Sequence, residues 1–227
     1  MDSMNDLQMK NAGSIRNIIF DLGGVLLNID SRLTGKALEE MGVKNMEEVH
    51  ARLTDAKLYQ RFDTGECSLG CFRDEIRQAC GIRLTDEQVD NAWNALLMDF
   101  PNHRVELLHN LRSNYRLFLL SNTNSIHYQS YMNTFRSVHG EEMTDLFEKL
   151  FLSFEMGMHK PDAAIYEMAL RLGNLLAPET LFIDDVFANA DAAANMGMLA
   201  FHLYNGIDVT DLFINGKLRQ TAEFLYK

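Results

Sequence analysis

The chain has 227 residues, of which 47% are hydrophobic, and its formal net charge at pH 7 is −11. This length and composition exclude a disordered chain and fit a globular core with an accessory module. The negative charge argues against a nucleic-acid partner, and the sequence shows neither a secretory signal nor a membrane-spanning run. We therefore expect a cytoplasmic protein that binds no membrane.

The first predicted strand ends in a carboxylate followed by two glycines. Residues 1–14 are polar, and we expect them to form a loose extension. The apolar run Asn17–Phe20 predicts a buried parallel strand, and Asp21, Gly23 and Gly24 come after it. Ligands of open α/β sheets bind beyond the carboxyl ends of the strands, so Asp21 is a candidate functional residue. Capping a turn or a helix is the alternative role.

Residues 31–100 have a helical pattern. Apolar residues recur at spacings of three and four within 38–41, 49–62, 71–80 and 88–98, and glycines separate the segments. We predict a bundle of short amphipathic helices. Arg61, Phe62 and Asp63 are candidates to face a ligand, and ordinary packing explains them equally well.

Two later segments carry groups that suit an anion. The apolar run that ends at Leu120 leads into Ser121 and Asn122, which can donate hydrogen bonds to a phosphate, although helix capping is their ordinary role. Further on, Lys160 precedes Pro161, which we expect at the first position of a helix. A solvated surface lysine is the alternative.

A further apolar run, residues 181–183, ends in the adjacent acids Asp184 and Asp185, and a helix is expected from Ala188 to Asn195. Two neighbouring carboxylates repel each other, and a hard divalent cation with oxygen ligands relieves that repulsion. A solvated acidic turn is the alternative.

Strand and helix patterns alternate along the second half of the chain. Strands are expected from residue 116, at 150–153, at 181–183 and at 198–203, with helical sequence between them. This order predicts an α/β fold, with a Rossmann-like parallel sheet flanked by helices on both faces. We expect residues 212–225 to cover the sheet or a neighbouring subunit, and the pattern leaves open whether the protein is a monomer or a homodimer.

Four motifs stand in a recognisable order: Asp21, Ser121, Lys160 and the pair Asp184–Asp185. With them the chain resembles the haloacid dehalogenase-like hydrolase superfamily. The residues of these motifs are most similar to those of the subgroup that contains α-glucose-1-phosphate phosphatases and the phosphatase domain of soluble epoxide hydrolases. The resemblance implies a core of residues 15–30 and 101–227, with residues 31–100 inserted as a small helical cap of the C1 type.

The same resemblance implies a phosphatase that acts on a small phosphorylated metabolite. Asp21 would attack phosphorus and form an aspartyl-phosphate, which water then hydrolyses. Ser121, Asn122 and Lys160 would hold the phosphoryl oxygens during this transfer.

Magnesium is the cofactor that the resemblance implies. Mg²⁺ would bind Asp21, the carbonyl oxygen of Gly23 and Asp185, with Asp184 in direct or indirect contact. Asn189 would orient the loop that carries Asp185.

One position departs from the family pattern. Most phosphatases of the superfamily have a second aspartate two residues after the nucleophile, where this chain has Gly23. Such an acid–base group is typically worth about 10²- to 10⁴-fold in rate, so we expect easier leaving groups, such as those of sugar 1-phosphates. Asp30 is a candidate substitute, and capping the next helix is its alternative role.

Other functions stay open from the sequence. A 2-haloacid dehalogenase would use Asp21 against carbon without magnesium, but that version of the family has a tyrosine where Gly23 stands. A non-catalytic protein that binds a phosphorylated ligand is motivated by the missing acid, and an epoxide hydrolase would require a further domain. His159 is the histidine expected at the mouth of the site, and Cys67, Cys71 and Cys80 are expected as reduced thiols.

Overall fold

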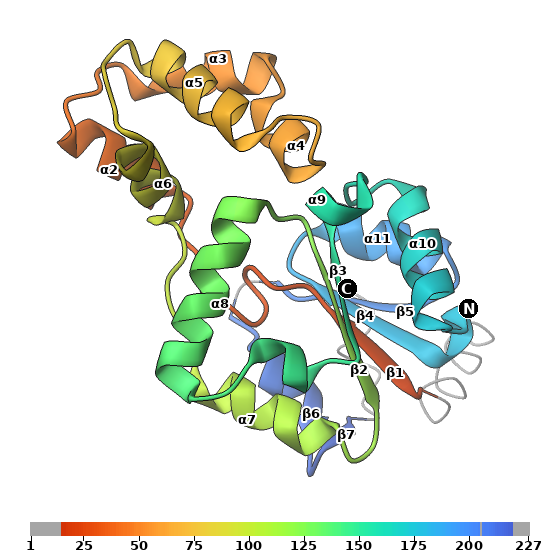
Figure 1. Ribbon diagram of the computed structural model, residues 1–227. Coiled ribbons are helices and arrows are strands. Elements are labelled where there is room, and N and C mark those ends of the chain that lie inside the picture. The colour runs from red at the N-terminus through yellow and green to blue at the C-terminus, as the bar shows by residue number, and fades with distance from the viewer. Residues whose placement is uncertain (1–14, 205, 220–227) are drawn as a thin grey trace.

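The computed structural model describes residues 15–204 and 206–219 (Figure 1). The predicted extension at residues 1–14, and the part of the predicted C-terminal segment after residue 219, lie outside these ranges. Of the helices in the described part, none is both long and apolar enough to cross a membrane.

Within the described residues the core is a five-stranded parallel sheet with the strand order β3-β2-β1-β4-β5. Phe20 in the central strand lies opposite Leu119 on one side and Ile183 on the other, so the neighbouring strands end at one edge. This sheet confirms the α/β prediction and brings the polar ends of separate segments together. The strands are β1 (Asn17–Phe20), β2 (Arg116–Ser121), β3 (Lys149–Leu152), β4 (Thr180–Asp184) and β5 (Leu199–His202).

Helices cover both faces of the sheet (Figure 1). Successive residues of β1 point to opposite faces, and accordingly Ile18 and Phe20 pack in one buried cluster and Ile19 in another. The first cluster includes residues of α7 (Asn102–Leu111) and α8 (Ser125–His139), and the second includes residues of α10 (Ala163–Gly173) and α11 (Phe187–Asn195).

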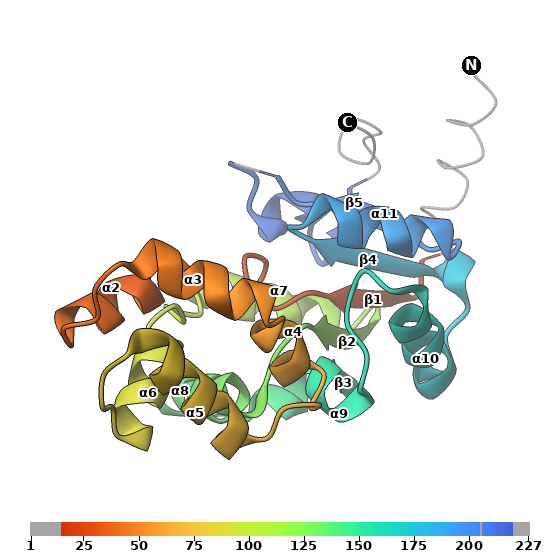
Figure 2. The same ribbon diagram turned by 90° about the horizontal axis from the view of Figure 1, so that it is seen from above.

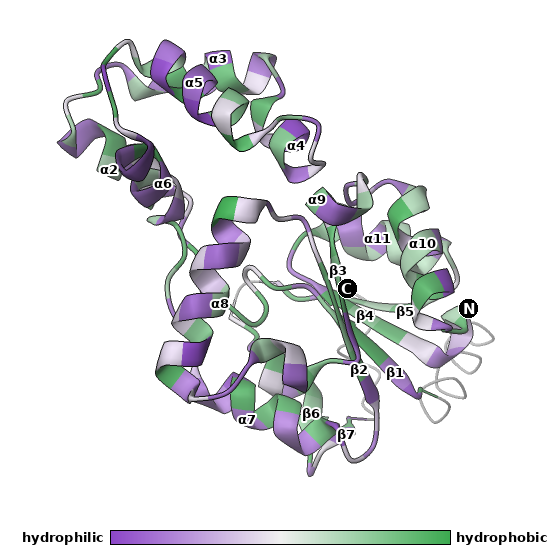
Figure 3. Cartoon of the chain, in the orientation of Figure 1, coloured by the Kyte–Doolittle hydropathy of each residue, from purple (hydrophilic) through white to green (hydrophobic). Residues whose placement is uncertain are grey.

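A second group of helices lies beyond the carboxyl ends of the strands (Figure 2). Its helices share a buried apolar cluster to which Ile126 of α8 also belongs, and hydrophilic and hydrophobic residues alternate around them (Figure 3). We call this group the cap, and its helices are α2 (Arg32–Glu40), α3 (Met46–Asp55), α4 (Leu58–Asp63), α5 (Leu69–Cys80) and α6 (Asp86–Asn94).

The cap differs from the prediction in two places. The helix expected over residues 49–62 is divided, because Lys57 between α3 and α4 takes a left-handed backbone conformation with φ of 50°. The helix expected up to Met98 ends at Asn94, because the residues after it pair with another segment instead.

The two segments that connect the cap to the core pair with each other. The backbone N–H of Asn28 donates to the carbonyl of Asp99, and the N–H of Met98 donates back to Asn28, both at 2.9 Å. Two residues on, the N–H of Asp30 donates to the carbonyl of Leu96 at 3.0 Å. The chain therefore leaves and re-enters the core through one short antiparallel ladder.

Three further predictions concern where helices and strands begin and end. The strand expected to reach Ser153 ends one residue earlier, and Ser153 begins the short helix α9 (Ser153–Met156). Pro161 follows a cis peptide bond and precedes α10, so its expected place at the first helical position is wrong. Residues 209–218 form η3 (Val209–Leu212), β6 (Phe213–Ile214) and β7 (Lys217–Leu218), and η3 packs against α7.

Candidate active site

A buried lysine occupies the centre of the sheet edge. The Lys160 ammonium donates to Oδ1 of Asp21 and to Oδ2 of Asp184, both at 2.6 Å, and to the carbonyl of Leu120 at 2.9 Å. Its side chain is only 1% exposed. Burial opposes its charge, but the attraction of the two carboxylates holds the pKa of Lys160 above the ordinary value. The structure thus excludes a solvated surface lysine.

Three carboxylates share this edge. Oxygen atoms of Asp21, Asp184 and Asp185 all lie within 4.8 Å of one another. Burial is the largest cause that raises the pKa of Asp21, to about 7, and it also raises the pKa of Asp185. Because three carboxylates face one ammonium group, a divalent cation would balance the remaining negative charge.

The adjacent acids have different surroundings. Asp184 is fully buried, and it accepts hydrogen bonds from the backbone N–H of Val186 and from the amide of Asn189 as well as from Lys160. The Asp185 carboxylate is half-buried and has no hydrogen-bond partner among the described residues. Asp185 therefore has the freer carboxylate, while Asn189 contacts Asp184 through its side chain and Val186 through its backbone N–H.

The second glycine after Asp21 makes room for Asp185. A Cβ atom on Gly24, whose φ is +77°, would lie 2.2 Å from Oδ2 of Asp185. Gly24 is therefore required for this close approach, a role that the sequence alone did not assign. At Gly23 a Cβ would lie 3.2 Å from Cδ1 of Ile29, so Ile29 stands beside the position of the absent acid.

Asn122 fixes the backbone of the lysine segment. Its side-chain amide donates to the carbonyl of Lys160 at 2.9 Å, and its Oδ1 accepts from the Lys160 N–H at 2.8 Å. The Asn122 side chain is therefore used within the protein, and its contact with a phosphoryl oxygen stays a prediction. The Ser121 hydroxyl has no hydrogen-bond partner among the described residues and lies at the end of β2.

The cap contributes a carboxyl group to the same region. Oδ1 of Asp63, the last residue of α4, accepts from the amide of Asn124 at 2.9 Å, and Oδ2 lies 3.9 Å from Nε2 of His159. Nδ1 of His159 is 3.1 Å from the Asn122 amide. Burial raises the pKa of Asp63 to about 6 and lowers the pKa of His159. Asp63 thus reaches residues next to Ser121 and Lys160.

The three cap residues that were candidates to face a ligand have different surroundings in the structure. Arg61 pairs with Glu75 at 3.0 Å, and Phe62 stacks on Phe72 in the cap interior with ring centroids 4.0 Å apart, so only Asp63 turns to the core. Behind it, a Cβ on Gly65 would lie 2.7 Å from a carbonyl oxygen of α9, which shows how closely the α4–α5 loop approaches the core.

Asp30, the expected substitute for the missing acid, is bound elsewhere. The guanidinium of Arg32 donates to both of its oxygens, at 2.9 and 2.7 Å, and these hydrogen bonds lower the pKa of Asp30 to about 2. Oδ1 also accepts a hydrogen bond from the backbone N–H of Arg32, the first residue of α2, at 3.0 Å, so these contacts fit the alternative role of Asp30 at the start of the next helix. The sequence alone could not show whether Asp30 or Asp63 is the better candidate for the missing acid, because the answer depends on the residues that each contacts in the fold.

Asn124 is the residue that sequence analysis missed. It caps α8 by accepting from the N–H of His127 at 3.0 Å, while its amide holds Asp63. The only tryptophan of the chain, Trp93 of α6, stacks on His127 at 4.9 Å and donates from Nε1 to Asn124 at 3.4 Å. The capping pattern at Asn124 was readable from the sequence, but its contacts with the cap were not.

The three cysteines are free thiols, and Cys67 and Cys71 lie together beside Glu75 on α5. The carboxylate of Glu75 is held by Arg61, whose guanidinium contacts both of its oxygens.

Comparison with known proteins agrees with this geometry. A family model described as haloacid dehalogenase-like hydrolase matches residues 15–197. D-ribitol-5-phosphate phosphatase of Bacteroides thetaiotaomicron is 29% identical over 194 residues, which cover 86% of this chain and 94% of that protein.

Solved structures give the same result. A HAD family enzyme of Bacteroides thetaiotaomicron, in complex with magnesium and inorganic phosphate, is 34% identical with a TM-score of 0.82, covering 88% of this chain and 100% of that one. L-2-haloacid dehalogenase of Xanthobacter autotrophicus covers 83% of this chain and 77% of its own with a TM-score of 0.57, but at 18% identity it shows a shared fold alone.

The chain belongs to the haloacid dehalogenase-like hydrolases, and it is an enzyme of that family. The narrower resemblance to α-glucose-1-phosphate phosphatases stays a prediction.

Proposed function

We propose that the protein is a magnesium-dependent phosphatase that hydrolyses a small phosphorylated polyol or sugar through an aspartyl-phosphate. The observation that carries this proposal is the cluster of three carboxylates around one buried lysine at the carboxyl edge of the sheet. Two related proteins support it: one is named a D-ribitol-5-phosphate phosphatase, and another was solved with magnesium and phosphate.

The donor set suits a hard cation. Asp21 and Asp185 offer carboxylate oxygens, and the Gly23 carbonyl accepts no hydrogen bond from a described residue. Asp184 supports this set from behind, since both of its oxygens already accept hydrogen bonds. When bound, Mg²⁺ supplies positive charge that offsets the repulsion between the carboxylates and the phosphoryl group.

The phosphoryl group would be held by donors that the fold leaves free. The Ser121 hydroxyl is one, and the backbone N–H groups of Leu22 and Gly23 have no backbone partner among the described residues. Lys160 adds a fixed positive charge. Because charge spreads over the phosphoryl oxygens in the transition state, donors that are already in position stabilise it without reorganisation.

Asp21 is the nucleophile of the proposed reaction. Its Oδ1 accepts from Lys160, whereas its Oδ2 accepts no hydrogen bond from a described residue and is the oxygen free to attack phosphorus. The ester bond to the leaving oxygen breaks as the aspartyl-phosphate forms, and water then hydrolyses that acyl phosphate and restores Asp21.

Asp63 supplies the proton that the missing acid would have given to the leaving oxygen. It lies on the cap side of the site, is partly protonated near neutral pH because its pKa is about 6, and contacts Asn124 and His159. With Asp63 in this role, Gly23 no longer restricts the enzyme to sugar 1-phosphates, and a primary alcohol such as that of ribitol is also an acceptable leaving group.

Dehalogenation uses the same nucleophile but needs no metal. The unpaired Asp185 carboxylate next to Asp21 has no purpose in that reaction, which favours the phosphatase.

The test measures phosphate release from ribitol 5-phosphate, glucose 1-phosphate and para-nitrophenyl phosphate, with Mg²⁺ and with EDTA. Wild-type activity should require Mg²⁺, and Asp21→Asn should lower it more than about 10³-fold. No release from any of the three esters would exclude the proposal.

The role of Asp63 is tested by leaving-group dependence. Para-nitrophenolate leaves without a proton, so Asp63→Asn should keep most of the activity on that ester and lose about 10²-fold on ribitol 5-phosphate. An equal loss on both esters would indicate a structural role for Asp63 instead.

A further inference from the structure

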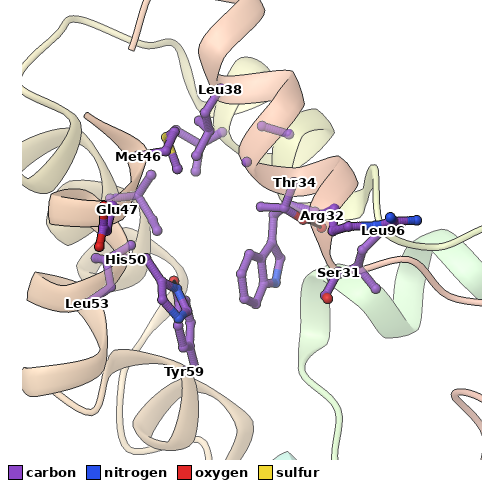
Figure 4. Close-up of a pocket in the computed structure, with 15 residues that line it drawn as sticks. Ser31, Arg32, Thr34, Leu38, Met46, Glu47, His50, Leu53, Tyr59 and Leu96 are labelled. Atoms are coloured by element: carbon purple, nitrogen blue, oxygen red, sulfur yellow. Dashed lines mark hydrogen bonds between the residues drawn. The ribbon is translucent and has the colours of Figure 1, made fainter. Parts of the chain in front are cut away.

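The interior of the cap is hollow. A cavity of about 520 Å³ lies between helices α2 to α6 (Figure 4). The lining is mainly apolar and includes the buried side chains of Leu38, Leu53 and Ile76, together with the rings of Tyr59 and Trp93. Asp21, Asp184, Asp185, Ser121 and Lys160 are all absent from the lining.

This volume is large for a packed helical bundle. Protein interiors are filled to about the density of organic crystals, and an apolar cavity of only about 150 Å³ already binds benzene. Small-molecule sites typically measure about 300–1,000 Å³ and are mainly apolar with a few polar groups. The cap cavity falls in that range and has that kind of lining.

Polar groups lie at two separate parts of the lining and indicate the chemistry of the ligand. Figure 4 shows Arg32 away from Glu47 and His50, and all three are exposed to solvent. Nδ1 of His50 lies 3.3 Å from the Tyr59 hydroxyl. Because the charge of Arg32 is balanced by Asp30 and Glu47 carries the opposite sign, the lining as a whole favours an uncharged molecule over an ion.

We propose that the cap cavity is a binding site for a small, uncharged, largely apolar molecule with one hydroxyl group, separate from the phosphate site. The apolar body would contact Leu38, Leu53 and Trp93, and the hydroxyl would lie near His50 and Tyr59. Trp93 forms the partition between the two sites, because its Nε1 contacts Asn124 while it also lines the cavity.

The single tryptophan makes this proposal directly measurable. Decan-1-ol, titrated into the full-length protein below its solubility limit, should change Trp93 emission in a saturable way with one site per chain. Inorganic phosphate with Mg²⁺ should leave the dissociation constant within about twofold, since no phosphate-site residue lines the cavity.

Two glycines provide a matched pair of variants. Gly35 lines the cavity on α2, and a Cβ there would meet only Cε of Met46, at 3.8 Å. Gly70 lies on α5 with nothing within 4 Å of its Cβ, and it is not part of the lining. Gly35→Leu should weaken decanol binding at least tenfold, and Gly70→Leu should leave it unchanged.

Three outcomes would overturn the proposal. They are the absence of saturable binding in the wild type, unchanged binding in Gly35→Leu, and mutual exclusion between decanol and phosphate. Because the readout is binding, a failure here is distinguishable from a failure of the phosphatase proposal.

Discussion

The active-site edge of the core and the interior of the cap are filled in opposite ways. At the core edge, charged groups are buried and held at short distances, as the three hydrogen bonds of Lys160 illustrate. In the cap, apolar side chains surround a volume that they leave open. This difference shows that the core holds its charged groups in fixed positions. The cap instead leaves apolar surface available to contact a bound molecule.

The largest effect should come from the buried charge at the core edge. Lys160→Met leaves three carboxylates without their ammonium partner, and the free energy of unfolding should fall by about 4 kcal/mol. Urea unfolding in EDTA measures this. Lys149→Met, on the exposed end of β3, serves as the control and should stay within about 0.5 kcal/mol of the wild type. A loss below about 1 kcal/mol for Lys160→Met would contradict the described arrangement.

A smaller change in the free energy of unfolding, of opposite sign, should come from Asp63, which lies where the cap meets the core. The pKa of Asp63 is raised from 3.8 to about 6, so between these values the unfolded chain loses its proton first and the folded state loses stability as the pH rises. At pH 8, Asp63→Asn should therefore stabilise the protein by up to about 3 kcal/mol, and at pH 4 by little.

Thermal unfolding at pH 4 and pH 8 tests this dependence. Asp55→Asn, at an exposed position of the same cap, is the control and should change stability by less than about 0.5 kcal/mol. If Asp63→Asn gave the same shift at both pH values, ionisation of Asp63 would not be the cause.

The close approach at Gly24 gives the next effect. Gly24→Ala combines a strained positive φ with a clash against Asp185, and it should lower stability by about 2 kcal/mol. It should also raise the magnesium concentration for half-maximal activity about tenfold. Gly42→Ala has a positive φ but open space around its Cβ, so it should lose stability without changing the magnesium requirement.

The smallest effect should come from filling the cap. Gly35→Leu and Gly70→Leu both remove a helical glycine, which is worth about 0.5–1 kcal/mol. Gly35→Leu also buries its side chain in the cavity and should gain about 1 kcal/mol more than Gly70→Leu. Equal gains in chemical unfolding would indicate that the cavity closes by other means.

The core edge was predictable because its signals are local. Asp21, Ser121 and Asp184 each come after a short apolar run, and parallel strands that start in register must end together. The cap was less predictable. A spacing of three and four predicts which face of a helix is apolar, but it says nothing of a left-handed residue such as Lys57 or of how completely the faces fill the space between them.

Long-range contacts account for the remaining errors. Asp63 lies within the inserted segment, and only the folded chain shows that it meets Asn124 of the core. In the same way, a glycine is needed at position 24 because Asp185, which lies far along the sequence, packs against it.

The ladder between residues 28–30 and 96–99 determines how the cap can move. Two separate tethers would allow the cap to drift in any direction, but a paired ribbon bends easily only about one axis. We therefore expect the cap to swing mainly toward or away from the sheet edge, as a hinged flap does. After a single cut in one linker, the other linker would keep the cap attached, and the hydrogen bonds of the ladder would hold the cut strand in place.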